Sequence, residues 1–142
     1  MVPLFNADGN LPKGVHLATW SEFCDRFGFT PHRRRLLGGM KRAMDSLRAA
    51  GCKTFYIGGS FVTSKEIPDD YDGCWSTQEV DFNLLDPVLL DFSANRLAQK
   101  IKYGGELFLT HQIEGNSRKT FLEFFSIDKD TGKPKGLVML NL

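Results

Sequence analysis

The stretch that decides the fold reads IGGS at residues 57–60, and DYD follows it after a short spacer at residues 70–72. The run CKTFYI at residues 52–57 predicts a strand that leads directly into the glycines. A strand that ends in Gly-Gly-Ser and turns into a helix exposes backbone N–H groups, and phosphate oxygens bind well to such groups. We therefore expect the turn at Gly59 and Ser60 to bind phosphate.

The two aspartates on either side of Tyr71 are the second half of this pattern. Asp70 and Asp72 are separated by one residue, so both side chains point to the same face of the strand expected at 71–75. Two neighbouring carboxylates repel each other unless a cation lies between them, and such hard oxygen ligands suit Mg²⁺ shared with substrate phosphates. Asp69 is an alternative ligand, but it does not share that face. We therefore predict a metal site at Asp70 and Asp72.

The remaining signals predict one α/β (α+β) domain over residues 1–142, in which helices flank a small mixed sheet. Thr19 with Glu22 matches a capping box, and Thr30-Pro31 combines a cap with a proline in the first turn. The expected elements are an extended arm over 1–18, helices over 19–27 and 30–50, a strand over 52–57, a short helix over 61–65, a strand over 71–75, a helix over 86–103, and strands over 120–127 and 137–142.

Composition excludes several functional classes. The net charge is +1, so no overall field draws the chain onto nucleic acid or an anionic membrane, and nothing indicates DNA binding. The three cysteines are too widely spaced for a disulfide framework or a zinc site, and they suit a reducing compartment. No Walker lysine follows the glycines. Neither a signal peptide nor a membrane span is evident, so we expect a cytoplasmic protein.

These motifs resemble the signature of the nucleotidyltransferase fold, the superfamily of polymerase beta and the small minimal nucleotidyltransferases. There a Gly-Ser turn precedes an Asp-x-Asp pair on the second strand, and a third carboxylate lies on a later strand after a helix. The position that matches here is Glu123, within FLEFF. The resemblance implies that Asp70, Asp72 and Glu123 are catalytic and hold one or two Mg²⁺ ions. It also implies that Gly58, Gly59 and Ser60 bind an NTP such as ATP.

The whole chain also resembles short bacterial nucleotidyltransferase-like proteins associated with toxin–antitoxin or phage-defence gene pairs. The matching stretches are GGSFVTSKEIPDDYD, LDPVLLDF, KYGGELF, FLEFF and TGKPKGLVMLNL. The resemblance implies transfer of NMP from an NTP to a hydroxyl acceptor on RNA or protein, with a cognate toxin or antitoxin as partner. One alternative is a catalytically weak member of this fold that acts by binding its partner. Another is an RNA-binding accessory protein.

Several basic residues are further candidates for contact with anions. Lys65 follows Ser60 by about one turn and could neutralise a β- or γ-phosphate, although most lysines are surface charges. Lys100, Lys102 and Tyr103 could meet the nucleotide or the acceptor. The run RRR at residues 33–35 begins a helix, where positive charge opposes the helix dipole. It indicates either an anionic partner such as RNA or a solvated helix face.

Overall fold

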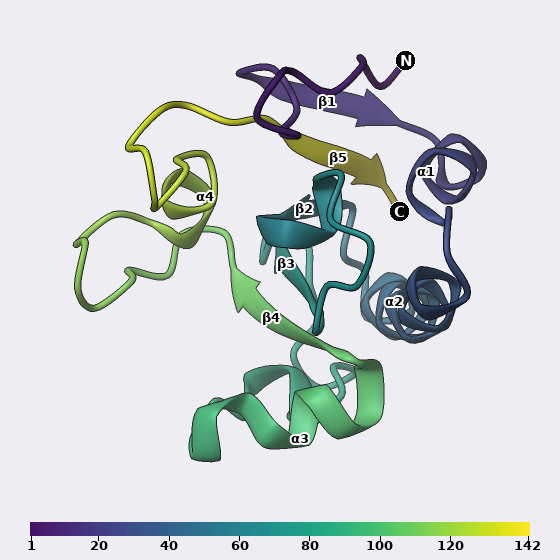
Figure 1. The fold of residues 1–142 in the computed structure, drawn as a ribbon. Coiled ribbons are helices and arrows are strands. Elements are labelled where there is room, and N and C mark those ends of the chain that lie inside the picture. Colours follow the sequence, from purple (N-terminus) through teal and green to yellow (C-terminus); the bar gives the residue numbers. More distant parts are fainter.

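A five-stranded mixed sheet forms the centre of the computed structural model, which describes residues 1–142 (Figure 1). Strands β1 and β5 run parallel, as do β3 and β4, and β2 is antiparallel to both of its neighbours. The strands in spatial order are β1 (Val15–Ala18), β5 (Leu137–Asn141), β2 (Thr54–Gly58), β3 (Tyr71–Trp75) and β4 (Gly105–Leu109). The predicted fold class, a small mixed sheet flanked by helices, is confirmed.

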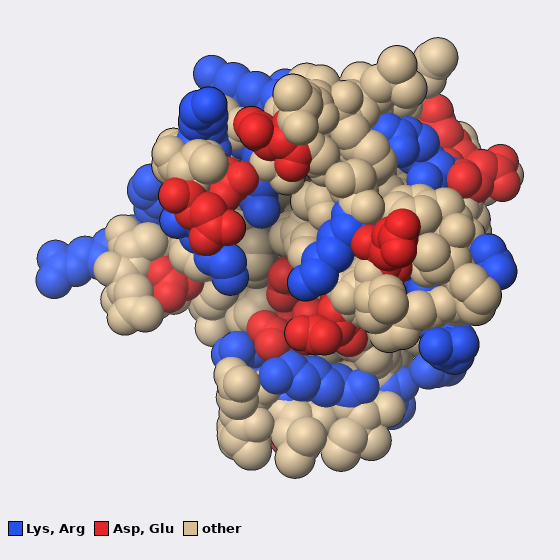
Figure 2. All heavy atoms as spheres, viewed as in Figure 1, with Lys and Arg blue, Asp and Glu red and all other residues tan.

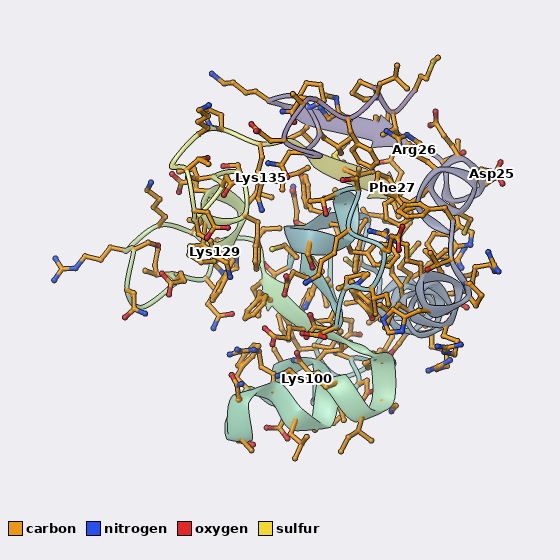
Figure 3. The ribbon with its side chains drawn as sticks, in the orientation of Figure 1. Asp25, Arg26, Phe27, Lys100, Lys129 and Lys135 are labelled. Atoms are coloured by element: carbon orange, nitrogen blue, oxygen red, sulfur yellow. The ribbon has the colours of Figure 1, made fainter.

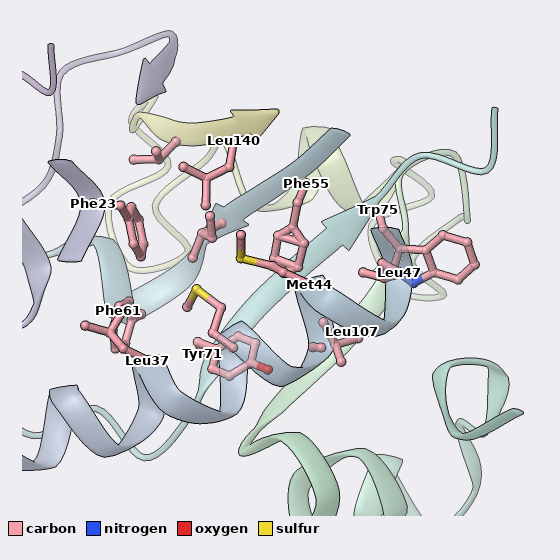
Figure 4. Close-up of a cluster of buried hydrophobic side chains, with 14 of the residues drawn as sticks. Phe23, Leu37, Met44, Leu47, Phe55, Phe61, Tyr71, Trp75, Leu107 and Leu140 are labelled. Carbon is pink, nitrogen blue, oxygen red and sulfur yellow. The ribbon is translucent and has the colours of Figure 1, made fainter. Parts of the chain in front are cut away.

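Two helices cover one face of this sheet, and both begin where the sequence predicts. Thr19 caps α1 (Trp20–Phe27) and Thr30 caps α2 (Pro31–Ala49), each through a hydrogen bond from a backbone N–H to its hydroxyl oxygen. Figure 4 shows the core between α2 and the sheet. Its labelled members include Leu37, Met44 and Leu47 from α2 and Phe55, Tyr71, Trp75, Leu107 and Leu140 from the strands.

Alternation along the strands sends a different set of side chains to the other face of the sheet. Tyr71 and Trp75 of β3 are buried against the helices, so Asp72 points away from them. Leu107 of β4 is buried in the same core, so Glu106 and Phe108 also point away. The short helix α4 (Phe121–Phe124) and the chain on either side of it lie over this second face (Figure 1). The polar candidates therefore gather on the sparsely covered face.

The structure corrects four of the predicted elements. The strand expected at 120–127 is wrong, because Thr120 and Glu123 form a capping box that begins the short helix α4 instead. Strand β4 lies after the predicted helix, at residues for which the sequence predicts no element, and β1 lies within the predicted arm. The helix expected over 86–103 divides into the 3-10 helix η2 (Pro87–Leu90) and α3 (Ser93–Tyr103). The short helix after the glycines is the 3-10 helix η1 (Gly59–Val62).

No helix of the chain is both long enough and apolar enough to cross a membrane.

Candidate active site

Three carboxylates share the face of the sheet that points away from α2. Asp72 lies in β3 opposite Glu106 of β4, and paired residues of neighbouring strands project to the same side. Asp70 stands two positions before Asp72, immediately before the same strand. All three line an open cleft of about 680 Å³, together with Gly59 and Ser60. The cleft is the hollow with a red floor near the centre of Figure 2.

The carboxylate of Asp72 lies directly against the Gly-Ser turn. Gly58, the last residue of β2, pairs with Asp72 across the sheet. Gly59 has a φ of 67°, and a Cβ on it would lie 2.2 Å from Oδ2 of Asp72. Glycine is required here both by the left-handed backbone and by the approach of the carboxylate. The structure thus brings together the turn and the aspartate pair that the sequence singled out.

The charges of this pair are only partly offset by nearby cations, which are Lys100 and Arg96 for Asp70 and Lys129 and Lys135 for Asp72. Neither aspartate has a hydrogen-bonding partner among the causes of its pKa shift. Burial, reinforced by the charges of Asp70 and Glu106, raises the pKa of Asp72 to about 7. Burial and the charge of Glu106 also raise the pKa of Asp70. A cation between the two would relieve both effects, so the donor set fits a hard divalent ion such as Mg²⁺.

Glu106 differs from the pair because basic side chains already engage it. Its Oε2 lies 3.1 Å from Nε of Arg96, and its Oε1 lies 3.1 Å from Nζ of Lys100. No set of three histidine, cysteine, aspartate or glutamate side chains is arranged to hold a metal ion. A metal ion held by Asp70 and Asp72 would gain Glu106 as a third ligand only if Arg96 and Lys100 released it.

Glu123 does not lie beside the aspartate pair, contrary to the sequence-based assignment. It belongs to α4, is exposed, and accepts a hydrogen bond at 2.8 Å from the hydroxyl of Thr120. It is absent from the lining of the cleft. The third carboxylate on the shared face is Glu106, in the run GELFL at residues 105–109. Its short apolar run after two glycines is the signal that could have identified the strand.

Arg33 is fully buried, which excludes it from contact with RNA. Its guanidinium donates hydrogen bonds to the backbone carbonyls of Phe27, Phe61, Thr63 and Lys65. These bonds hold the loop that connects the Gly-Ser turn to the aspartate pair. The neighbouring arginines at 34 and 35 are exposed. Arg33 therefore positions the loop of the candidate site by binding its backbone carbonyls.

The other predicted basic residues fall into two groups. Lys65 lines the cleft, and Lys100 borders it through its pairing with Glu106. Lys102 and Tyr103 instead contact Asp86, outside the cleft, with Nζ of Lys102 at 2.6 Å from Oδ2 of Asp86. Lys102 and Tyr103 are therefore not placed to contact a nucleotide in the cleft.

Sequence reasoning missed two lysines that border the cleft. Lys129 and Lys135 lie on the segment before β5, on the side of the cleft away from Lys100 (Figure 3). Burial lowers the pKa of Lys135, although the charges of Asp128 and Asp72 act against this effect. The acidic floor is therefore bordered by cations on both sides. Such an arrangement suits an anion that reaches the floor together with a metal ion.

Comparison with known proteins identifies a matching family, but one whose function is unknown. No curated protein and no solved structure matches the chain. A family model described as "Family of unknown function (DUF6932)" matches residues 3–141. Because the match covers nearly the whole sequence, including every residue of the cleft, the protein belongs to the DUF6932 family.

Proposed function

We propose that this protein transfers NMP from an NTP to a hydroxyl acceptor on RNA or protein, with the help of Mg²⁺. The observation that carries the proposal is the carboxylate of Asp72, seated against Gly59 of the Gly-Ser turn, with Asp70 beside it. A phosphate at the turn would therefore lie next to the carboxylate pair. The resemblance to minimal nucleotidyltransferases supports the same reaction.

Each part of the cleft has a distinct task in this reaction. Asp70 and Asp72 hold Mg²⁺, which neutralises charge on the phosphates of the NTP. The backbone of the Gly59 turn and the Ser60 hydroxyl bind phosphate oxygens. Lys65, Lys129 and Lys135 offset the remaining charge of the triphosphate.

The reaction requires few further groups from the protein. The acceptor hydroxyl attacks the α-phosphorus and forms a new O–P bond, while its proton passes to solvent. The bond between the α-phosphorus and the oxygen bridging to the β-phosphate breaks, and pyrophosphate leaves. Catalysis of this kind depends mostly on positioning and charge neutralisation, which the rigid sheet provides. We place the reaction in the cytoplasm, because all three cysteines are free thiols.

A second candidate is a partner-binding subunit of a toxin–antitoxin or phage-defence pair. Leu97 and Ile101 stand one turn apart on α3 with exposed fractions of 51% and 76%, which favours contact with another protein. The pairing of Glu106 with Arg96 and Lys100 would suit a site with weak turnover. In this case Leu97→Ser with Ile101→Ser abolishes the biological effect, whereas loss of the aspartate pair does not.

The test of the proposed reaction is incubation with each α-labelled NTP, Mg²⁺ and cell extract. We expect label to appear on RNA or protein with at least one NTP, and chelation of Mg²⁺ to prevent it. Absence of label with all four NTPs, from a protein that is folded and binds its partner, would favour the partner-binding subunit.

A further inference from the structure

All of the apolar lining of the cleft lies on one wall. The floor is acidic and the rims carry lysines, whereas the hydrophobic lining comes from the end of β4 and from the segment that contains α4. No residue of α4 is buried. Its rings are therefore not simply part of the core, although they are large and apolar. The aromatic wall, as we call it, consists of Phe108, Phe121, Phe124, Phe125 and Ile127.

Two rings of the aromatic wall have no stacked partner. One of them, Phe125, is tilted against Phe108 and Phe121, and the other is Phe124. Phe108 and Phe121 stack on each other, with ring centroids 3.9 Å apart and an angle of 16° between the planes. Arg96 lies over the ring of Phe108 at 5.0 Å. Phe124 meets Phe121 and Phe125 only edge to face, at 78° and 72°. Phe124 thus brings to the cleft a ring whose faces are not stacked on another ring.

The aromatic wall is fixed directly beside the Gly-Ser turn. A Cβ on Gly58 would lie 2.7 Å from Cβ of Phe125, so α4 rests on the end of β2. Gly59 follows at once and contacts the carboxylate of Asp72. A molecule that fills the cleft therefore meets an apolar aromatic surface on one side, and the Gly-Ser turn and the aspartate pair on the other.

We propose that Phe124 stacks on the base of the nucleotide whose phosphates bind at the Gly-Ser turn. This inference rests on the proposed function and adds the subsite that holds the nucleobase. Stacking on a phenylalanine tolerates every base, because each base has a π face. The aromatic wall therefore selects nucleotides over other phosphate esters without selecting one base. All four NTPs bind with similar affinity.

The experiment compares ATP with inorganic tripolyphosphate, which carries similar charge but no base. Each is titrated calorimetrically into the protein in the presence of Mg²⁺. We expect ATP to bind about tenfold more tightly than tripolyphosphate. Phe124→Leu keeps an apolar side chain but removes the ring, so the affinity for ATP falls to that for tripolyphosphate. The affinity for tripolyphosphate stays as in the wild type.

Two further variants keep the result interpretable. Phe82→Leu changes an exposed phenylalanine that does not line the cleft, and it should leave both affinities unchanged. Phe124→Trp retains a ring, so it retains the preference for ATP. Its indole fluorescence is quenched by ATP and not by tripolyphosphate. This measurement also covers the case in which Phe124→Leu fails to fold.

The outcomes separate this inference from the proposed function. If tripolyphosphate binds and ATP binds no more tightly, the base subsite is wrong and the phosphate and metal site stands. Equal weakening of both ligands by Phe124→Leu would make Phe124 a structural residue and would also overturn the inference. If neither ligand binds the wild type with Mg²⁺, the proposed function fails, and the base subsite fails with it.

Discussion

Replacing Gly59 with alanine tests whether the Asp72 carboxylate must lie against the Gly-Ser turn. The added Cβ would lie 2.2 Å from Oδ2 of Asp72, which is 1.2 Å short of the 3.4 Å at which ordinary contact begins. Because this oxygen is at the end of a side chain, the carboxylate moves away by about 1 Å while the sheet stays intact. A misplacement of ~1 Å can lower a reaction rate by about 100-fold.

Gly132→Ala is the matched control for the backbone. Gly132 has a φ of 74°, close to the 67° of Gly59, but a Cβ there has no neighbour within 4 Å. Both variants should lose about 1–2 kcal/mol of unfolding free energy from the left-handed conformation, measured by urea denaturation. Only Gly59→Ala should lose label transfer. Equal transfer by the two variants would refute the claim that the contact between Gly59 and Asp72 shapes the site.

Three further predictions concern single side chains. Because burial raises the pKa of Asp72 to about 7, the folded state holds this proton more tightly than the unfolded chain does. In metal-free urea denaturation, stability should therefore fall as the pH rises from about 4 to about 7, by at most about 4 kcal/mol, and Asp72→Asn should remove that fall. Glu106→Gln should slow label transfer at least about tenfold. Glu123→Gln should keep both transfer and stability, because glutamine also completes the capping box with Thr120; the opposite pattern would restore the assignment from sequence. Arg33→Met leaves four backbone carbonyls without their donor, two of them in buried hydrogen bonds, and should cost about 3 kcal/mol or more in thermal and urea unfolding. Arg34→Ser should stay within ~0.5 kcal/mol of the wild type.

The parts of the site that the sequence predicted correctly depend on local signals. The strand before Gly59 and the strand that contains Asp72 are marked by their own residues and by the glycines between them. The caps at Thr19 and Thr30 act within four residues of the chain. Local patterns of this kind place the Gly-Ser turn and the aspartate pair without knowledge of the tertiary structure.

The parts that were missed depend on contacts between distant segments. Glu106 joins the site because β4 pairs with β3, and this pairing is not visible in the short run GELFL. Arg33 looks like a surface charge until the loop that accepts its hydrogen bonds folds over it. Glu123 was misplaced for a different reason. The run TFLE at residues 120–123 matches a capping box, whereas the alternation in TFLEFFSI favours a strand, and the local cap decides the structure.

The most direct test of the central claim compares α-labelled with γ-labelled NTP, for the wild type and for Asp70→Asn with Asp72→Asn. The double variant preserves side-chain volume and removes the repulsion between the carboxylates, so its melting temperature without metal should equal or exceed that of the wild type. We predict that the wild type transfers the α label and not the γ label to an acceptor, and that the double variant transfers neither. Transfer of the γ label by the wild type, or undiminished transfer of the α label by the double variant, would contradict nucleotidyl transfer at this site.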